Sequence, residues 1–251
     1  MISIISPAKN MRNLQLKNIE PKTTGYNRYF SKETEIISNT LKLLSPWDLQ
    51  SIMKINEKLA FQSYAYFQDF NFKDKGVCAL AAYDGLVFKN IKAEEFTLED
   101  FNFANDHIRI LDAFYGIATP LDGVLPYRLE MQYPIKINNQ SIYDFWGDKL
   151  YKKLYEEDKV IINLASEEYA KAVRRYLSKD DIFIDIDFKV HRDQKLKTMA
   201  TWAKMARGQM IKYIVENKIN DPVDLKNFIY NGYKFDESLS SQKKYVFVKQ
   251  D

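Results

Sequence analysis

The sequence of 251 residues has few of the side chains that build disulfides and metal sites. It contains one cysteine, Cys78, and two histidines, His107 and His191. A single cysteine excludes an internal disulfide and is typical of a reducing compartment. Without a C-x-x-C or H-E-x-x-H motif, two distant histidines nearly exclude a zinc site. We therefore expect no metal and no cofactor, and we expect Cys78, which lies in an apolar stretch, to be a buried and unreactive thiol.

Glycine, proline and long apolar runs are also scarce. The 8 glycines and 7 prolines form no flexible linker, which favours one domain over residues 1–251. No apolar run approaches the roughly 18 residues of a membrane span, and the first residues lack the features of a signal peptide. The glycine-rich nucleotide loops G-x-x-x-x-G-K-[ST] and G-x-G-x-x-G are absent. We therefore expect a cytoplasmic protein with no membrane segment, and the sequence indicates no oligomeric state.

The pattern of apolar residues predicts strands that alternate with helices. Strands are expected at 3–6, 77–82, 127–133, 159–164, 182–188 and 245–248, and helices at 31–44, 46–53, 57–69, 97–114, 142–155, 166–177 and 198–217. This order is typical of the α/β class, or α+β, with a mixed β-sheet flanked by helices. Residues 31–69 would form a helical insertion.

The charge is nearly balanced overall but is uneven along the chain. The net charge is only +3, whereas residues 189–218 contain eight basic and two acidic residues, a net +6. A local positive potential attracts anionic partners even when the whole chain is almost neutral. A solvated helix face would give the same count.

Polar residues gather where the predicted elements end, which is where α/β sheets place their sites. Four chain segments and the long predicted helix at 198–217 contribute to this set: Ser6 and Lys9; Arg128 and Glu130; Trp146; Asn163 and Ser166; Lys204 and Arg207. Taken singly, each has a structural explanation, such as a core aromatic for Trp146 or a helix cap for Ser166. Taken together, they predict one cleft in which the basic groups bind an anion.

Glu130 is the expected acid or base if this cleft carries out a reaction. It lies near two basic candidates, Lys9 and Arg128, and no histidine competes with it. We therefore assign Glu130, Lys9 and Arg128 as hypothetical catalytic residues.

The same segments resemble the YaaA family of bacterial peroxide-stress proteins. The similarity extends almost from end to end and rests on these motifs: Ser6-Pro7-Ala8-Lys9, Tyr127-Arg128-Leu129-Glu130-Met131, Phe145-Trp146-Gly147-Asp148, Asn163-Leu164-Ala165-Ser166, Lys204-Met205-Ala206-Arg207-Gly208 and Gly232-Tyr233-Lys234-Phe235-Asp236. The resemblance implies a cytoplasmic protein that limits hydrogen peroxide damage, partly by keeping unincorporated iron low. It also implies binding of double-stranded DNA, a basic cleft and a helix-hairpin-helix element.

Residues 45–69 fit the plan of such a hairpin. Two predicted helices are joined by Lys54, Ile55 and Asn56, and amides and lysines at the second helix would contact a DNA phosphate. The usual loop glycine is missing, and Asn56 is expected to tolerate the left-handed conformation in its place. Lys54, Asn56 and Lys58 are thus nucleic-acid-binding candidates, together with Lys204 and Arg207 of the cleft. An ordinary packed helical hairpin is the alternative.

Two functions from different classes remain open. The first is a stress protein that binds the DNA backbone with little sequence preference. The alternative is an enzyme that acts on a nucleotide, a base or a small anion in the Lys9/Arg128/Lys204/Arg207 cleft. Direct iron storage is disfavoured because no paired Glu-x-x-His motif of a di-iron bundle is present.

Overall fold

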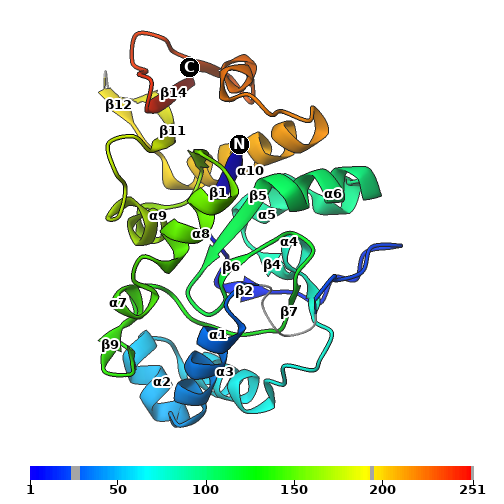
Figure 1. Cartoon of the computed structure of the whole chain (residues 1–251), viewed down its shortest axis with the longest axis vertical. Coiled ribbons are helices and arrows are strands. Elements are labelled where there is room, and N and C mark those ends of the chain that lie inside the picture. Colours follow the sequence, from blue (N-terminus) through cyan, green and yellow to red (C-terminus); the bar gives the residue numbers. More distant parts are fainter. Residues whose placement is uncertain (24–28, 193–194, 250–251) are drawn as a thin grey trace.

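The computed structural model describes residues 1–23, 29–192 and 195–249, so Asp193 of the basic segment lies outside it. A sheet of eight strands, counted among these residues, occupies the centre (Figure 1). Its order is β13-β14-β11-β10-β1-β5-β6, and β12 pairs with β11. The strands are β1 (Ile2–Ile5), β5 (Ile108–Asp112), β6 (Gly116–Ala118), β10 (Val160–Asn163), β11 (Ile182–Arg192), β12 (Lys195–Lys197), β13 (Tyr233–Phe235) and β14 (Lys244–Lys249).

The sheet is mostly parallel, which confirms the predicted mixed α/β class. Strands β14, β11, β10, β1 and β5 run parallel, whereas β6, β12 and β13 are antiparallel additions. All residues of Ile2–Ile5 are buried, as expected for a parallel strand covered on both faces. That strand lies between β10 and β5, so the N-terminal segment forms the middle of the sheet.

Two groups of helices pack against the sheet. Helix α6 (Leu98–His107) contacts β1 and β5, and α10 (Ala200–Glu216) contacts β11, α6 and α5 (Leu86–Ile91). Helix α8 (Lys149–Glu157) packs on β10 and contacts α9 (Glu167–Arg174). Among the described residues, no helix has the length and apolar character needed to cross a membrane.

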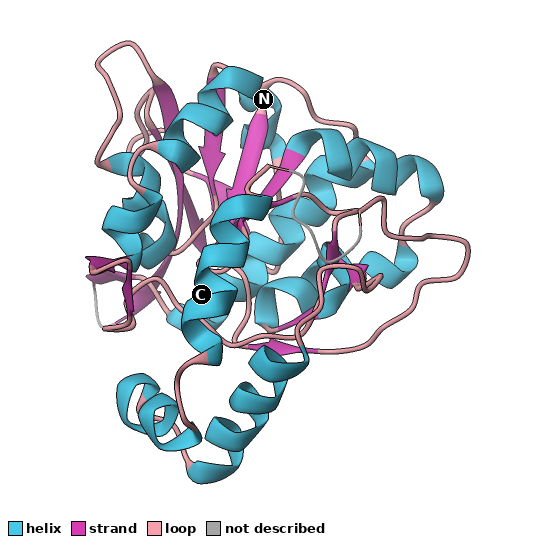
Figure 2. Cartoon of the chain, turned by 60° about the horizontal axis from the view of Figure 1, so that its bottom comes forward, coloured by secondary structure: helices cyan, strands magenta, loops and turns pink. Residues whose placement is uncertain are grey.

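Helices α1 (Ser31–Lys42), α2 (Pro46–Met53) and α3 (Glu57–Asp69) lie at one end of the molecule, below the sheet in both views (Figures 1 and 2). Their positions agree with the helices predicted from the sequence. The caps explain this agreement: Ser45 and Asp48 form a reciprocal capping box on α2, and Asn56 accepts a hydrogen bond from the Leu59 amide.

The remaining elements are short. They are β2 (Asn10–Met11), β3 (Val77–Cys78), α4 (Ala79–Ala82), β4 (Tyr83–Asp84), β7 (Gly123–Val124), β8 (Lys136–Ile137), β9 (Gln140–Ser141), α7 (Ile142–Trp146) and two 3₁₀ turns, Ala93–Glu95 and Pro222–Asn227.

The largest error of the sequence prediction concerns residues 97–114, which were expected to be one helix. The helix ends at His107, and Ile108–Asp112 is a central strand that pairs with β1 and β6. The apolar spacing continues through this junction, but pairing with β1 outweighs the local helical pattern.

Three further segments differ from the prediction. Residues 127–133 alternate in character but form no strand, because no neighbouring strand pairs with them. Only Val77–Cys78 of the expected strand at 77–82 is extended, and Ala79–Ala82 is helical. Helices α7 and α8 replace a single helix, since Gly147 between them has a φ of 52°.

Cys78 is buried, as the sequence predicts. Burial raises the pKa of its thiol to about 11, because the apolar surroundings disfavour the thiolate.

Candidate functional site

The site begins where two parallel strands end side by side. Ile4 of β1 is in register with Asn163 of β10, and the chain continues from these strands to Ser6 and Ser166. The Ser6 hydroxyl donates to Ser166 Oγ at 3.1 Å and accepts from the Ser166 amide at 2.8 Å. The two loops are therefore joined at the carboxyl edge of the sheet, where such folds place their ligands.

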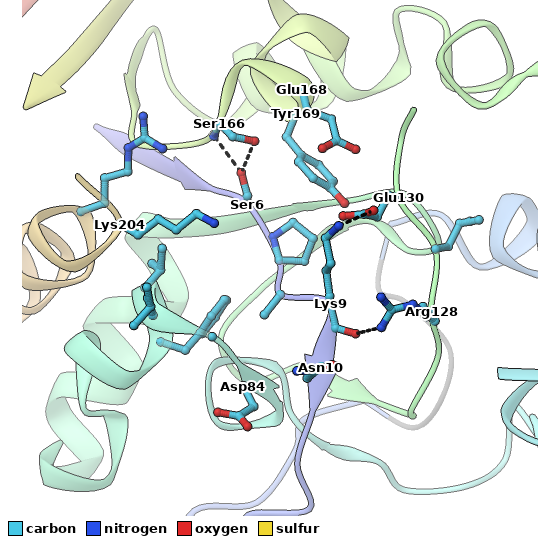
Figure 3. Close-up of a pocket in the computed structure, with 18 of the residues that line it drawn as sticks. Ser6, Lys9, Asn10, Asp84, Arg128, Glu130, Ser166, Glu168, Tyr169 and Lys204 are labelled. Carbon is cyan, nitrogen blue, oxygen red and sulfur yellow. Dashed lines mark hydrogen bonds and ion pairs between the residues drawn. The ribbon is translucent and has the colours of Figure 1, made fainter. Parts of the chain in front are cut away.

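A cavity of about 410 Å³ opens beside this serine pair (Figure 3). Its walls come from the loops after β1 and β10, residues 84–88, residues 127–132 and helix α10. The structure brings seven of the predicted residues together around it: Ser6, Lys9, Arg128, Glu130, Ser166, Lys204 and Arg207. A volume of this size is in the range of ordinary small-molecule sites.

One wall of the cavity holds an ion pair. Lys9 Nζ lies 2.9 Å from Glu130 Oε2, and the Glu130 side chain is only 10% exposed. Arg128 donates from Nη1 to the Lys9 carbonyl at 3.2 Å, which ties the two segments together. Glu130 is held by a turn rather than by the predicted strand, with the Tyr133 amide donating to its carbonyl.

Glu168 and Tyr169 are pocket residues that the sequence did not single out. Burial raises the pKa of Glu168, and the Glu130 carboxylate raises it further. The Gln132 amide donates to Glu168 Oε1 at 3.3 Å. Figure 3 shows the Tyr169 ring beside the Lys9–Glu130 pair. Their position just after a predicted strand end is visible in the sequence, but nothing in the sequence shows that their side chains face Glu130.

The opposite wall carries two cations of α10 that lie one helical turn apart. Within the described residues, neither Lys204 nor Arg207 has a carboxylate within ion-pair distance, and Arg207 has no hydrogen-bond partner. Arg207 Nε is fully buried, and burial lowers the pKa of this guanidinium. In Figure 3 the Lys204 side chain extends into the pocket toward Ser6.

Gly208 explains how Arg207 reaches the pocket. A Cβ on Gly208 would lie 2.2 Å from the Val87 carbonyl oxygen, a distance at which atoms overlap. Only glycine lets α10 approach α5 this closely. Arg207, the residue before Gly208, lines the cavity together with residues 86–88 of α5.

The predicted basic segment is not a uniform cationic surface. Lys189, Lys212 and Lys218 form ion pairs with Asp187, Glu95 and Asp100 respectively. Among the described residues of this segment, Arg192, Lys195, Lys204 and Arg207 have no ion pair, and of these Lys204 and Arg207 line the pocket.

Two residues expected in the cleft do not line it, which corrects the predicted set. Trp146 is fully buried, and its indole Nε1 donates to the Ala113 carbonyl at 3.0 Å. Asn163 donates to Asp185 Oδ1 at 2.7 Å and accepts from the Ala165 amide at 3.0 Å. Trp146 thus fills the core, and Asn163 holds the loop that carries Ser166.

The hairpin between α2 and α3 differs in detail from the expectation. Lys54 adopts the left-handed conformation with a φ of 51°, while Asn56 is extended and caps α3. Lys54, and not Asn56, therefore occupies the left-handed position at which the hairpin usually has a glycine. Lys54 and Lys58 are exposed, and neither has an ion pair among the residues described.

A second hollow of about 250 Å³ lies between helix α3 and the pocket. One side of α3 forms its wall through Leu59, Gln62, Ser63 and Tyr66. The two hollows share Lys9, Asn10, Asp84, Tyr127 and Arg128. They are therefore adjacent hollows on the same side of the molecule.

No cluster of three or more His, Cys, Asp or Glu side chains within the described ranges is placed to hold a metal ion. What the site offers instead is a set of cations at one end and two interacting carboxylates at the other. The first can bind an anion, and the second can exchange a proton with a ligand.

Comparison with known proteins shows similarity over the whole chain. The sequence model described as peroxide stress protein YaaA matches residues 1–239. A UPF0246 protein of Clostridioides difficile is 40% identical over 251 residues, covering all of both chains. UPF0246 proteins of Agathobacter rectalis and Ligilactobacillus salivarius are 39% and 38% identical, each over 98% of both chains.

Proposed function

Because the chain belongs to the YaaA family of peroxide stress proteins, we propose that it binds double-stranded DNA and limits damage by iron and peroxide in the cytoplasm. The adjacent hollows beside α10 and α3 support this proposal, because they place the cations of the pocket and helix α3 of the hairpin on neighbouring parts of the surface. In this proposal the hairpin is a helix-hairpin-helix element.

The proposed contacts are made to the phosphate backbone. Lys54 and Lys58 flank the start of α3 and have no ion-pair partner in the described residues, so both are available to phosphates. The Leu59 amide already donates to Asn56, so it is not free for a phosphate. Binding through lysine side chains is electrostatic and carries little sequence preference.

A salt series on the double variant Lys54→Ala/Lys58→Ala tests this proposal. Each phosphate neutralised by a cation contributes a slope of about −0.9 to log K against log[salt]. The double variant should flatten this slope by up to ~2 and weaken binding to two unrelated duplexes equally. Fluorescence anisotropy with labelled duplexes measures both effects.

The matched control is Lys159→Ala/Lys179→Ala, which removes the same charge. Both lysines are exposed and precede β10 and β11, at the opposite edge of the sheet from Ser6 and Ser166. The control should keep the wild-type slope. If the hairpin variant and the wild type have equal salt slopes, the hairpin lysines do not contact DNA phosphates. If the variant loses affinity for only one of the two duplexes, the lysines recognise bases instead.

A second candidate function is an enzyme acting on a nucleotide, a base or a small anion. The observation that favours it is the carboxylate pair, because burial and, after it, the Glu130 charge raise the pKa of Glu168. A raised pKa suits a general acid, and Glu130 beside Lys9 suits the charged partner. Full turnover by Glu130→Gln in a reaction shown for this pocket would reject Glu130 as acid or base.

A further inference from the structure

Arg207 is a cation of the pocket wall that has no direct ion pair among the described residues. Its Nε is fully buried, and it has no hydrogen bond or ion pair within the described part of the chain. Asp185 and Asp187 lie on the nearby β11, but their ion pairs are with other residues, Arg174, Lys189 and Lys244. Asp187 and Asp185 stabilise the charge of this half-buried guanidinium through space, but neither forms an ion pair with it, so it is available to bind the anionic group of a ligand in the cavity.

The pocket is polarised along its length. Lys204 lies at one end, and Glu130, Glu168 and Lys9 lie at the other (Figure 3). Arg207 lies one turn after Lys204 on α10 and also lines the pocket. Lys9 and Arg128 offset the two carboxylates at their end, so it carries no excess positive charge, but it accepts hydrogen bonds from N–H or O–H groups. The fitting ligand is anionic at one end only.

The middle of the pocket fits a body larger than an inorganic anion. The wall of the pocket also includes apolar groups, contributed by Leu86, Leu129, Leu164 and the ring of Tyr169. A cavity of about 410 Å³ leaves space beyond an anion bound at α10.

From these observations we infer that the pocket binds one nucleoside monophosphate unit, with its phosphate on Arg207 and Lys204 and its nucleoside toward Glu130 and Glu168. The inference rests on the second candidate function, in which this pocket holds the ligand. The unit is either a free mononucleotide or one unstacked nucleotide of DNA, whose flanking backbone would lie along the adjacent hollow beside α3.

Calorimetric titration of the four deoxynucleoside monophosphates and of inorganic phosphate tests the first source. At least one mononucleotide should bind about tenfold or more tightly than phosphate. Arg207→Gln should weaken it by about 10- to 100-fold, the range for a charged hydrogen bond. Glu168→Gln should weaken the mononucleotide and leave phosphate affinity unchanged.

A duplex containing 2-aminopurine tests the second source, because this base becomes fluorescent when it unstacks. Saturating wild-type protein should raise the fluorescence, and Arg207→Gln should not. The matched control is Arg175→Gln, since Arg175 directly follows α9, is exposed, pairs with Asp144 of α7 and does not line the pocket. This control should behave as the wild type in both assays.

The outcomes separate this inference from the DNA proposal. Mononucleotide binding lost in Arg207→Gln supports a free nucleotide, and an Arg207-dependent fluorescence rise supports a nucleotide of DNA. Phosphate bound as tightly as every mononucleotide, or neither binding nor a fluorescence rise, overturns the inference. In the last case an intact salt slope on duplex DNA leaves the DNA proposal standing.

Discussion

The α2–α3 hairpin and the pocket are both proposed to contact phosphates, but they are built in opposite ways. The hairpin is local: its two helices are adjacent in the sequence and begin at their own caps, Ser45 and Asn56. The pocket joins segments that are as far apart as Ser6 and Arg207. Its charges are partly buried, whereas Lys54 and Lys58 are exposed.

This difference predicts whether a substitution at each site changes binding alone or changes stability as well. An exposed lysine contributes little to stability, so changes at the hairpin should act on binding and leave the fold intact. The pocket depends on close packing and on hydrogen bonds between distant loops, so changes there should act on stability and binding together.

The largest effect should come from Gly208→Val, which breaks the pocket without touching the hairpin. The new side chain would overlap the Val87 carbonyl and push α10 away from α5. We expect a loss of about 3 kcal/mol or more in the free energy of unfolding. Urea denaturation measures it, and Thr201→Val on the exposed side of α10 should change it by less than about 0.5 kcal/mol. A stable Gly208→Val protein would show that this helix contact can relax.

An intermediate effect should come from Asp185→Asn, which loosens the loop that carries Ser166. Burial raises the pKa of Asp185, but hydrogen bonds from Arg174 and Asn163 outweigh it and hold the pKa below its ordinary value. We expect a loss of about 1–2 kcal/mol in the free energy of unfolding at neutral pH.

The same variant gives a defined pH dependence. Since the folded-state pKa is lowered, the stabilisation is present above the ordinary aspartate value of about 3.9 and is lost as the pH falls through the folded value. The difference between wild type and Asp185→Asn should therefore shrink in acid when unfolding is followed across pH. Asp180→Asn, at an exposed position nearby, should show no such difference. If the difference in the free energy of unfolding between the two proteins stays constant down to the lowest pH measured, the charge of the Asp185 carboxylate does not contribute to stability.

The smallest effect sharpens the comparison at the hairpin. Lys54→Gly and Lys54→Ala remove the same charge, but only glycine relieves the left-handed conformation at this position. We expect Lys54→Gly to be more stable than Lys54→Ala by about 1 kcal/mol in thermal unfolding, with equal effects on the salt slope. Equal stability would mean that the loop adopts another conformation in solution.

The hairpin was predictable because its signals are short-range. Ser45, Pro46 and Asn56 mark helix starts by their own chemistry, and the observed helices begin there. Strand β5 was missed because its strand character depends on pairing with β1, about a hundred residues earlier. The strand ends at Ser6 and Ser166 were correctly located, but the sequence could not show that Trp146 points into the core or that Glu168 faces Glu130.

The position of β1 in the sheet has a consequence for synthesis on the ribosome. Its two neighbours are β5 and β10, and β10 ends at Asn163. The first strand therefore cannot pair on both sides until most of the chain has been synthesised. At 5–20 residues per second this delay is on the order of 10 s. Throughout it, the apolar segment Ile2–Ile5 lacks at least one partner strand, and the nascent chain depends on early helices and chaperones to keep that segment from aggregating.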